Sequence, residues 1–236
     1  MNLNKKIKSA ISLRWFILRA AVFAVAWLVL PWWLFLLVAL YCYFIPPFRS
    51  GKLFIPFFCL MILTIVQSPG FLFALVFGVA FYCILLIKDL LIINRRSAYE
   101  ILVLALSFFL IRDFFKGYNG LHGPALFWSF WCAVAIGLLV HSMMRFFEVD
   151  VPGRKNLRTV ISWLTILLSW QCILIGLLLP LDFIYQSIIA FVAIAFFCEL
   201  VAEYFWSDLS RTRIFVTASV FFALLVILFT SAPWKL

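Results

Sequence analysis

Long apolar runs, broken at short intervals by polar residues, proline and glycine, fill almost the whole chain. Most runs approach the length of a helix that crosses the hydrocarbon core of a bilayer, about 20 residues. The pattern predicts an all-α fold, a polytopic transmembrane helix bundle of about nine spans that forms a single integral membrane domain over residues 1–236. The predicted spans are 12–30, 32–45, 53–67, 71–93, 97–111, 124–144, 159–179, 182–204 and 213–231.

The longest charged interruption is the stretch His141–Arg158, with the sequence HSMMRFFEVDVPGRKNLR. Pro152 and Gly153 in its middle are typical of a turn. Because apolar runs lie on both sides, we expect a loop between two membrane spans. Its excess of Lys and Arg predicts that the loop faces the cytoplasm, where short loops carry more basic residues.

Pro31 divides the first apolar region, and two interpretations of that region differ in topology. In the first, the chain turns at Pro31 and residues 32–45 return as a short second span. In the second, residues 20–45 form one helix that is kinked at the proline. The second would put the basic N-terminus and the loop that holds Arg49 and Lys52 on opposite sides of the membrane, so the charge pattern favours the turn.

The first 19 residues are basic and run directly into the first span. They predict either an interfacial amphipathic helix or a basic anchor that continues into the span. Ala24-Val25-Ala26 resembles a signal-peptide cleavage site, but Arg14 and Arg19 interrupt the uncharged segment that such a site requires. We therefore expect no cleavage there, and we expect both arginines to extend toward the lipid headgroups.

The distribution of basic residues tests the span assignment. With the N-terminus in the cytoplasm, all but three of the 19 Lys and Arg residues lie at inner ends of spans, the exceptions being Arg112, Lys116 and Lys235. Such a bias is expected of a correct topology. We therefore predict a cytoplasmic N-terminus, an external C-terminus and a location in the cell (plasma or inner) membrane. Because the span 97–111 is short, eight spans is the alternative count.

Composition agrees with this class and excludes others. The 236-residue chain is 67% hydrophobic and 12% charged, whereas a soluble domain has about 25% charged residues. The net charge of +10 does not indicate a nucleic-acid-binding protein, because the basic residues form no continuous stripe. The expected partners are the lipid bilayer and other membrane protein subunits, with no nucleic acid and no cofactor.

Two features inside the spans concern helix packing. The six cysteines form no Cys-x-x-Cys pair and are expected to be small buried hydrophobic residues. Ala74/Gly78 and Ala133/Gly137 are pairs of small residues four positions apart, a spacing that permits close approach of two helix backbones but also arises by chance. No internal repeat is evident, which disfavours a secondary transporter.

Ionisable residues inside spans are expected to have a function or a specific partner, because charge is costly in lipid. Here they are predicted to lie at one depth near the inner ends of three spans. Two pairs within this layer, one basic and one acidic, have members four residues apart and therefore on one helix face. The layer comprises Lys88, Asp89, His141, Arg145, Glu199 and Glu203.

This layer has three interpretations: a structural cluster of ion pairs, a cytoplasm-facing cavity for an anionic headgroup or substrate, and a metal site. In the cavity the binding residues would be Lys88, Asp89 and Arg145, and the catalytic candidates would be His141, Glu199 and Glu203. One of the two glutamates would then act as a general base. A metal site formed by the three catalytic candidates lacks the paired Glu-x-x-His motifs of di-iron bundles, so no metal is expected.

No motif in the chain specifies a reaction, since His-Glu-x-x-His, Gly-x-Ser-x-Gly and Walker sequences are absent. The leading hypothesis is a non-catalytic, membrane-embedded subunit or scaffold of a larger complex. The alternative is a cytoplasm-facing membrane enzyme acting on a lipid or isoprenoid, which needs a connected polar cavity around the layer. A small-solute or ion transporter is the second alternative, although it needs a water-filled route through a nearly apolar midplane.

Overall fold

The computed structural model describes residues 3–45, 51, 53–88, 95–118, 123–147, 154–206 and 211–234. Over these residues the chain forms nine α-helices and no strand, which confirms the all-helical prediction. Each predicted span overlaps one of the helices. The helices are α1 Leu3–Val29, α2 Trp32–Phe44, α3 Phe54–Val66, α4 Phe71–Lys88, α5 Arg95–Gly117, α6 Gly123–Phe147, α7 Arg154–Leu178, α8 Phe183–Trp206 and α9 Arg211–Ser231.

Five of the described helices contain a segment long and apolar enough to cross a membrane. These segments are Phe71–Lys88, Gly123–Phe146, Asn156–Leu178, Phe183–Val201 and Ile214–Ser231. By contrast, α2 and α3 are apolar but have 13 residues each, about 20 Å of helix. That is less than a hydrocarbon core of about 30 Å. The described part of the chain therefore has the composition expected of a helical membrane protein, with five long candidate spans.

Pro31 separates two helices, as the first interpretation of this region predicts. α1 ends at Val29, Pro31 has the extended conformation (φ −62°, ψ 149°), and α2 begins at Trp32. The two helices pack against each other, which a single kinked helix over residues 20–45 cannot do, so that alternative is wrong. α1 is also continuous from Leu3, so the basic N-terminal residues belong to the same helix as the first predicted span.

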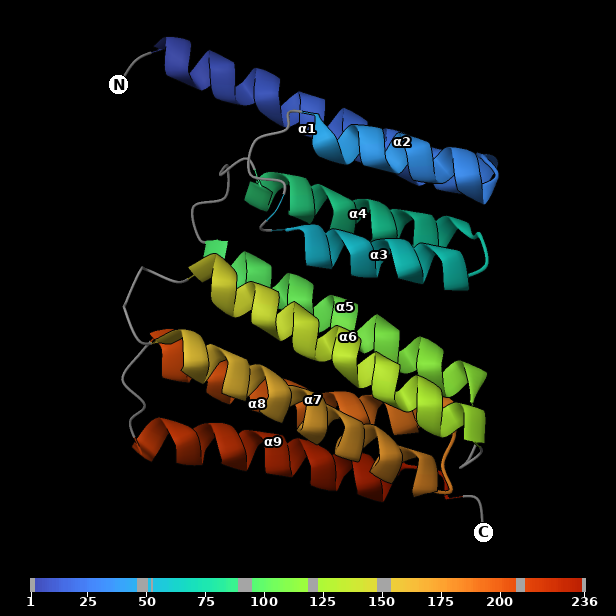
Figure 1. Ribbon diagram of the computed structural model, residues 1–236, viewed down its shortest axis with the longest axis vertical. Helices are drawn as coiled ribbons and strands as arrows, with labels where there is room; N and C mark the ends of the chain where they lie inside the picture. Colours follow the sequence, from blue (N-terminus) through green and yellow to red (C-terminus); the bar gives the residue numbers. More distant parts are fainter. Residues whose placement is uncertain are drawn as a thin grey trace. The chain divides into compact units, whose positions relative to one another are not determined.

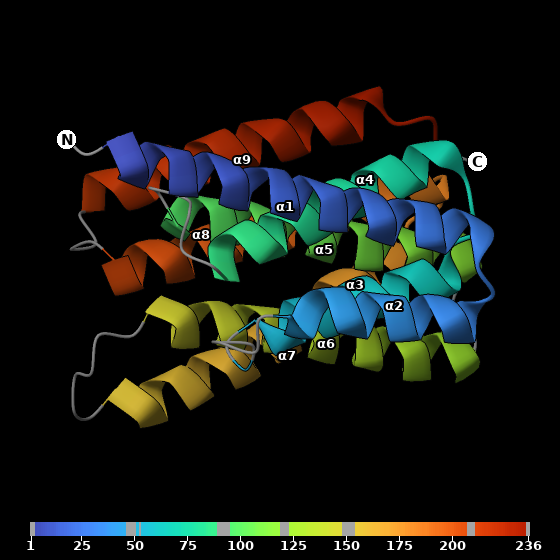
Figure 2. The same ribbon diagram turned by 90° about the horizontal axis from the view of Figure 1, so that it is seen from above.

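The chain divides into two compact units, Met1–Leu102 and Val103–Leu236, with the division inside α5. Within each unit, successive helices run in opposite directions, as Figure 1 shows and as can be followed from above in Figure 2. That the two units form a single domain over residues 1–236 stays a prediction.

Aromatic rings from all of α1 to α4 make the core of the first unit. The Phe23 ring centroid lies 4.3 Å from that of Phe81 and 5.1 Å from that of Phe35. Tyr43 and Phe57 stack with centroids 4.2 Å apart, and all five rings are buried. These contacts join α1 to α2 and α4, and α2 to α3, so aromatic packing holds the short helices in place.

In the second unit, α6 packs on α7, α7 on α8 and α8 on α9. Gly137 lies at the α6–α7 contact, where a Cβ atom on it would collide with Ile166 Cγ1. In the first unit, a Cβ atom on Gly78 would lie 3.1 Å from the Cβ of Ala24 on α1. Both small-residue pairs noted in the sequence therefore include a glycine at a close helix crossing.

Replacing Gly137 by alanine should weaken the α6–α7 contact, because the added methyl group must displace Ile166. We expect a loss of about 1–3 kcal/mol, measured as a lower midpoint of thermal unfolding in detergent. Gly123→Ala is the matched control on the same helix, since nothing lies within 4 Å of its added Cβ. A second substitution, Ile166→Ala, should recover part of the loss. Equal midpoints for Gly137→Ala and Gly123→Ala would contradict the close crossing.

Candidate functional site

Two buried cations bind the carbonyl groups at the C-terminal end of α2. The Lys88 ammonium of α4 donates to the Tyr43 carbonyl oxygen, and Arg19 of α1 donates through Nη1 to the carbonyl oxygen of Ile45. Lys88 is 2% exposed and Arg19 is 9% exposed. The last carbonyls of a helix have no partner within the helix and carry partial negative charge. The two side chains therefore satisfy and neutralise the end of a short helix.

The Lys88 ammonium also lies over the ring of Tyr43, 4.9 Å from its centroid. The ring face carries negative charge density and attracts the cation. Its position thus gives Lys88 a structural role in the first unit, and the headgroup-binding role predicted for it stays a prediction. Asp89, the other binding residue predicted on this span, lies outside the described residues.

His141 on α6 binds a hydroxyl group on α7. Its Nδ1 atom is 2.8 Å from Ser162 Oγ, and that hydroxyl donates to the Arg158 carbonyl oxygen, also over 2.8 Å. A hydroxyl group has one proton, so the imidazole Nδ1 is the donor in its own bond to Ser162. In the neutral imidazole this leaves Nε2 as the basic nitrogen.

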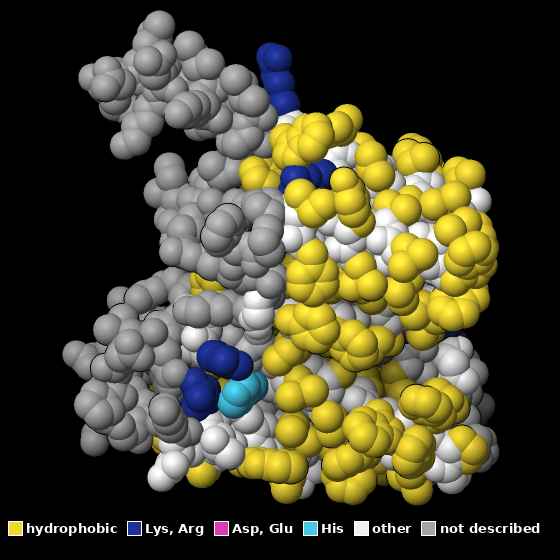
Figure 3. Space-filling view, turned by 45° about the horizontal axis from the view of Figure 1, so that its top comes forward, with side chains coloured by type: hydrophobic (Ala, Val, Ile, Leu, Met, Phe, Trp, Pro, Cys, Tyr) yellow, Lys and Arg dark blue, Asp and Glu magenta, His cyan; other side chains and the backbone are white. Residues whose placement is uncertain are grey.

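Two arginines accompany His141 near the end of α6 and the start of α7. Arg145 is exposed one turn beyond His141, and Arg158 is half-buried at the start of α7. Figure 3 shows two Lys or Arg side chains beside the histidine, at the margin of the apolar surface. We call His141, Arg145 and Arg158 the α6–α7 basic cluster. The sequence-based site omitted Arg158 and Ser162, although their position just across the predicted loop from His141 was a usable signal.

The predicted acidic pair lies on α8. Glu199 and Glu203 are both half-buried, and Glu203 lines a hollow of about 330 Å³ with Thr212, Val216 and Thr217 of α9. Glu203 thus contributes to the α8–α9 side of the unit. Its predicted juxtaposition with His141 and Arg145 stays a prediction. Among the described residues, no three His, Cys, Asp or Glu side chains are arranged to hold a metal ion.

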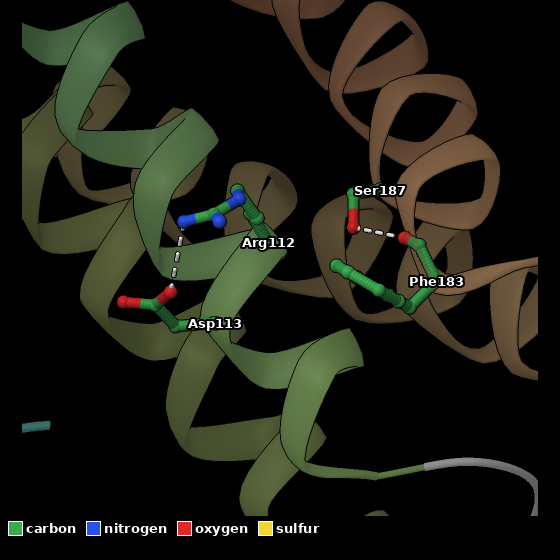
Figure 4. Close-up of polar contacts among 4 residues, drawn as sticks. All are labelled: Arg112, Asp113, Phe183 and Ser187. Carbon is green, nitrogen blue, oxygen red and sulfur yellow. Dashed lines mark hydrogen bonds and ion pairs between the residues drawn. The ribbon is translucent and has the colours of Figure 1, made fainter. Parts of the chain in front are cut away.

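Near the C-terminal end of α5, two adjacent residues form a local ion pair. Arg112 Nη1 lies 3.5 Å from Asp113 Oδ1, as Figure 4 shows. Asp113 follows the predicted span 97–111. The pKa of its carboxyl lies above the ordinary value because burial raises it more than the charges of Arg112 and Lys116 lower it. The same view shows the Ser187 hydroxyl donating to the Phe183 carbonyl one turn earlier on α8. The Ser187 contact satisfies the hydroxyl within its own helix.

Known proteins give no further indication of function, since no family model, no curated protein and no solved structure matches the chain. The class of the protein follows from its own residues. Over its described residues the chain is all-helical, and five helices are long and apolar enough to span a membrane. Lys88 and Arg19 bind carbonyl groups and lie near aromatic rings, and Arg112 pairs with a neighbouring carboxylate.

Removing the Lys88 ammonium should destabilise the first unit. In Lys88→Met the side chain keeps most of its volume, but the buried Tyr43 carbonyl loses a donor, so we expect a cost of about 1–3 kcal/mol. The midpoint of thermal unfolding in detergent measures this. Arg14→Met removes an exposed cation from α1 in the same unit and should leave the midpoint unchanged. If the two variants unfold at the same temperature as the wild type, Lys88 does not stabilise the end of α2.

Proposed function

We propose that the chain is a non-catalytic, membrane-embedded subunit or scaffold of a larger complex. It crosses the cell (plasma or inner) membrane nine times, with a cytoplasmic N-terminus and an external C-terminus. In this topology α1, α2, α3 and α5 cross the membrane together with the five long apolar helices. The alternating direction of successive helices within each unit supports this, because it brings the basic helix ends of that unit to one side.

The proposal is carried by the exposure of α9. No residue in its Ile214–Ser231 segment is buried, whereas 33–44% of the corresponding segments of α4, α6, α7 and α8 are buried. α9 packs along α8. Much of its apolar surface is therefore available to another molecule in the membrane.

The face of α9 toward α8 consists of large side chains. The ring centroids of Phe221 on α9 and Phe196 on α8 are 5.2 Å apart. Leu225 packs against the cluster that holds Leu181. Phe221 and Leu225 are four residues apart and therefore on one side of the helix, so this face is already used within the second unit.

The opposite face of α9 consists of small side chains. Ser219, Ala223 and Thr230 are exposed, and at 100° per residue they lie away from Phe221 and Leu225. The hydroxyls of Ser219 and Thr230 donate to the Phe215 and Val226 carbonyls, over 2.7 Å and 2.9 Å. Each hydroxyl thus has a partner in its own helix and does not need water.

This face suits a second helix. Ser219 and Ala223 are small residues four positions apart, the spacing at which membrane helices approach closely. Small side chains let a partner backbone approach without steric conflict, and dispersion contacts between two closely packed helices then stabilise the pair. We therefore assign the face formed by Ser219, Ala223 and Thr230, the α9 free face, to a transmembrane helix of a partner protein.

Photo-crosslinking in cells tests this assignment. With benzoylphenylalanine in place of Phe222, which is 70% exposed beside the α9 free face, we expect a discrete adduct heavier than the 27.4 kDa chain. Ser219→Leu and Ala223→Leu should each abolish the adduct because leucine blocks close approach. Val220→Leu, an equally apolar change at a position 53% exposed beside the free face, should preserve it.

Two results would contradict the proposal. One is an adduct with the mass of a single chain, because the reactive group has then met another part of the same molecule. The other is a monodisperse monomer after purification in mild detergent, with no intermolecular adduct in cells.

The enzyme alternative is favoured by one observation, the bond from His141 Nδ1 to Ser162, which leaves Nε2 as a possible base. Lipid analysis distinguishes this alternative from the proposal. It compares cells that lack the protein with cells that produce the wild type, the His141→Ala variant or the Glu199→Ala variant. The non-catalytic proposal predicts the same lipid composition in all four. A lipid that changes with the wild type and returns to its initial level in both variants, at equal protein abundance, would establish the enzyme instead.

A further inference from the structure

A groove of about 460 Å³ lies between α1 and α2, with Arg19 in its lining. Its volume falls within the range of small-molecule sites, about 300–1,000 Å³. Leu18 and Val22 of α1 and Leu37 of α2 form much of the wall, and all three are substantially exposed at 52%, 43% and 58%. The groove therefore opens sideways onto the apolar surface. In a membrane-spanning chain, a molecule that enters it comes from the bilayer.

Arg19 is held in a fixed orientation at one end of this groove. Its guanidinium donates to the Ile45 carbonyl, and its Cζ lies 5.3 Å from the Trp15 ring centroid and 5.9 Å from that of Phe16. The side chain is thus directed toward the end of α2, and its predicted position at the level of the lipid headgroups stays a prediction. A guanidinium group has five N–H donors in a rigid fork, so the carbonyl bond uses only part of its capacity.

The positive charge of Arg19 at this end of the groove favours an anionic ligand. The lining of the groove includes no acidic side chain, and a cation in apolar surroundings is costly unless a negative group compensates it. Arginine pairs with phosphate through two parallel hydrogen bonds. Figure 3 shows a Lys or Arg side chain set among apolar side chains on the exposed surface of the first unit.

Aromatic side chains identify the level of this end in the membrane. Trp15 and Tyr41 line the groove one turn from Arg19 and Ile45 respectively, and they are 54% and 69% exposed. Tryptophan and tyrosine concentrate at the depth of the lipid headgroups. From Trp15 to Val22 the groove follows about 11 Å of helix, enough for the glycerol region and the first part of one acyl chain.

We propose that the α1–α2 groove binds one anionic glycerophospholipid, with its phosphate on Arg19 and an acyl chain against Leu18, Val22 and Leu37. The inference rests on the proposed membrane topology, which puts this end in the cytoplasmic leaflet, where anionic lipids are enriched. It does not depend on the α9 free face, so the lipid site and the partner interface can fail separately.

Native mass spectrometry of the purified chain tests the site with two lipids that share the same acyl chains, phosphatidylglycerol and phosphatidylcholine. We expect the wild type to retain phosphatidylglycerol preferentially, and Arg19→Gln to lose the preference by about tenfold in affinity. Arg14→Gln is the matched control, since Arg14 is exposed on the same helix and is not part of the groove lining. It should bind as the wild type does.

A second variant keeps the test valid if Arg19→Gln does not fold. Leu37→Trp, at an exposed position, fills the groove and leaves Arg19 in place, so it should also lose the bound lipid. The proposal is overturned by equal retention of both lipids by the wild type, by equal losses in Arg14→Gln and Arg19→Gln, or by undiminished binding in Leu37→Trp. Displacement of the lipid by glycerol 3-phosphate alone would also overturn it, because the acyl chain would then contribute nothing.

Discussion

The hydrogen bonds to the carbonyl groups at the end of α2 constrain the packing of the first unit. With 13 residues, α2 is too short to cross the hydrocarbon core unaided, and unsatisfied carbonyls in apolar surroundings cost several kcal/mol each. Lys88 and Arg19 supply donors from two different helices. Since α4 and α1 must both lie against the end of α2 to do so, satisfying this backbone fixes three helices together.

Most of the fold could be predicted because the membrane simplifies the sequence. Apolar runs between Pro, Gly and charged residues mark the helices, and Pro31 ends α1 as its lack of an N–H predicts. Helix ends were harder to predict. α5 extends from Arg95 to Gly117 beyond the predicted 97–111, because charged side chains at a helix terminus reach water or each other, as Arg112 and Asp113 do, and therefore do not terminate the helix.

The candidate site was harder to predict than the fold. Helical spacing correctly indicates that His141 and Arg145 share a face of α6, but it cannot tell which neighbour that face meets. His141 contacts Ser162 on α7, and this contact lies at the close crossing beside Gly137. Lys88 donates to a backbone carbonyl of α2, and the position of a backbone group on another helix is not encoded in the spacing of side chains.

The polar contacts of Lys88, Ser219 and Thr230 are compatible with the proposed scaffold role. Lys88, Ser219 and Thr230 each donate a hydrogen bond to a backbone carbonyl within the chain. Such bonds stabilise helices and set their register. The surfaces suited to binding are lateral ones, the small side chains of α9 and the groove beside Arg19. In the proposed topology both surfaces face the bilayer, where a partner helix or a lipid would reach them, and on this the proposed scaffold role depends.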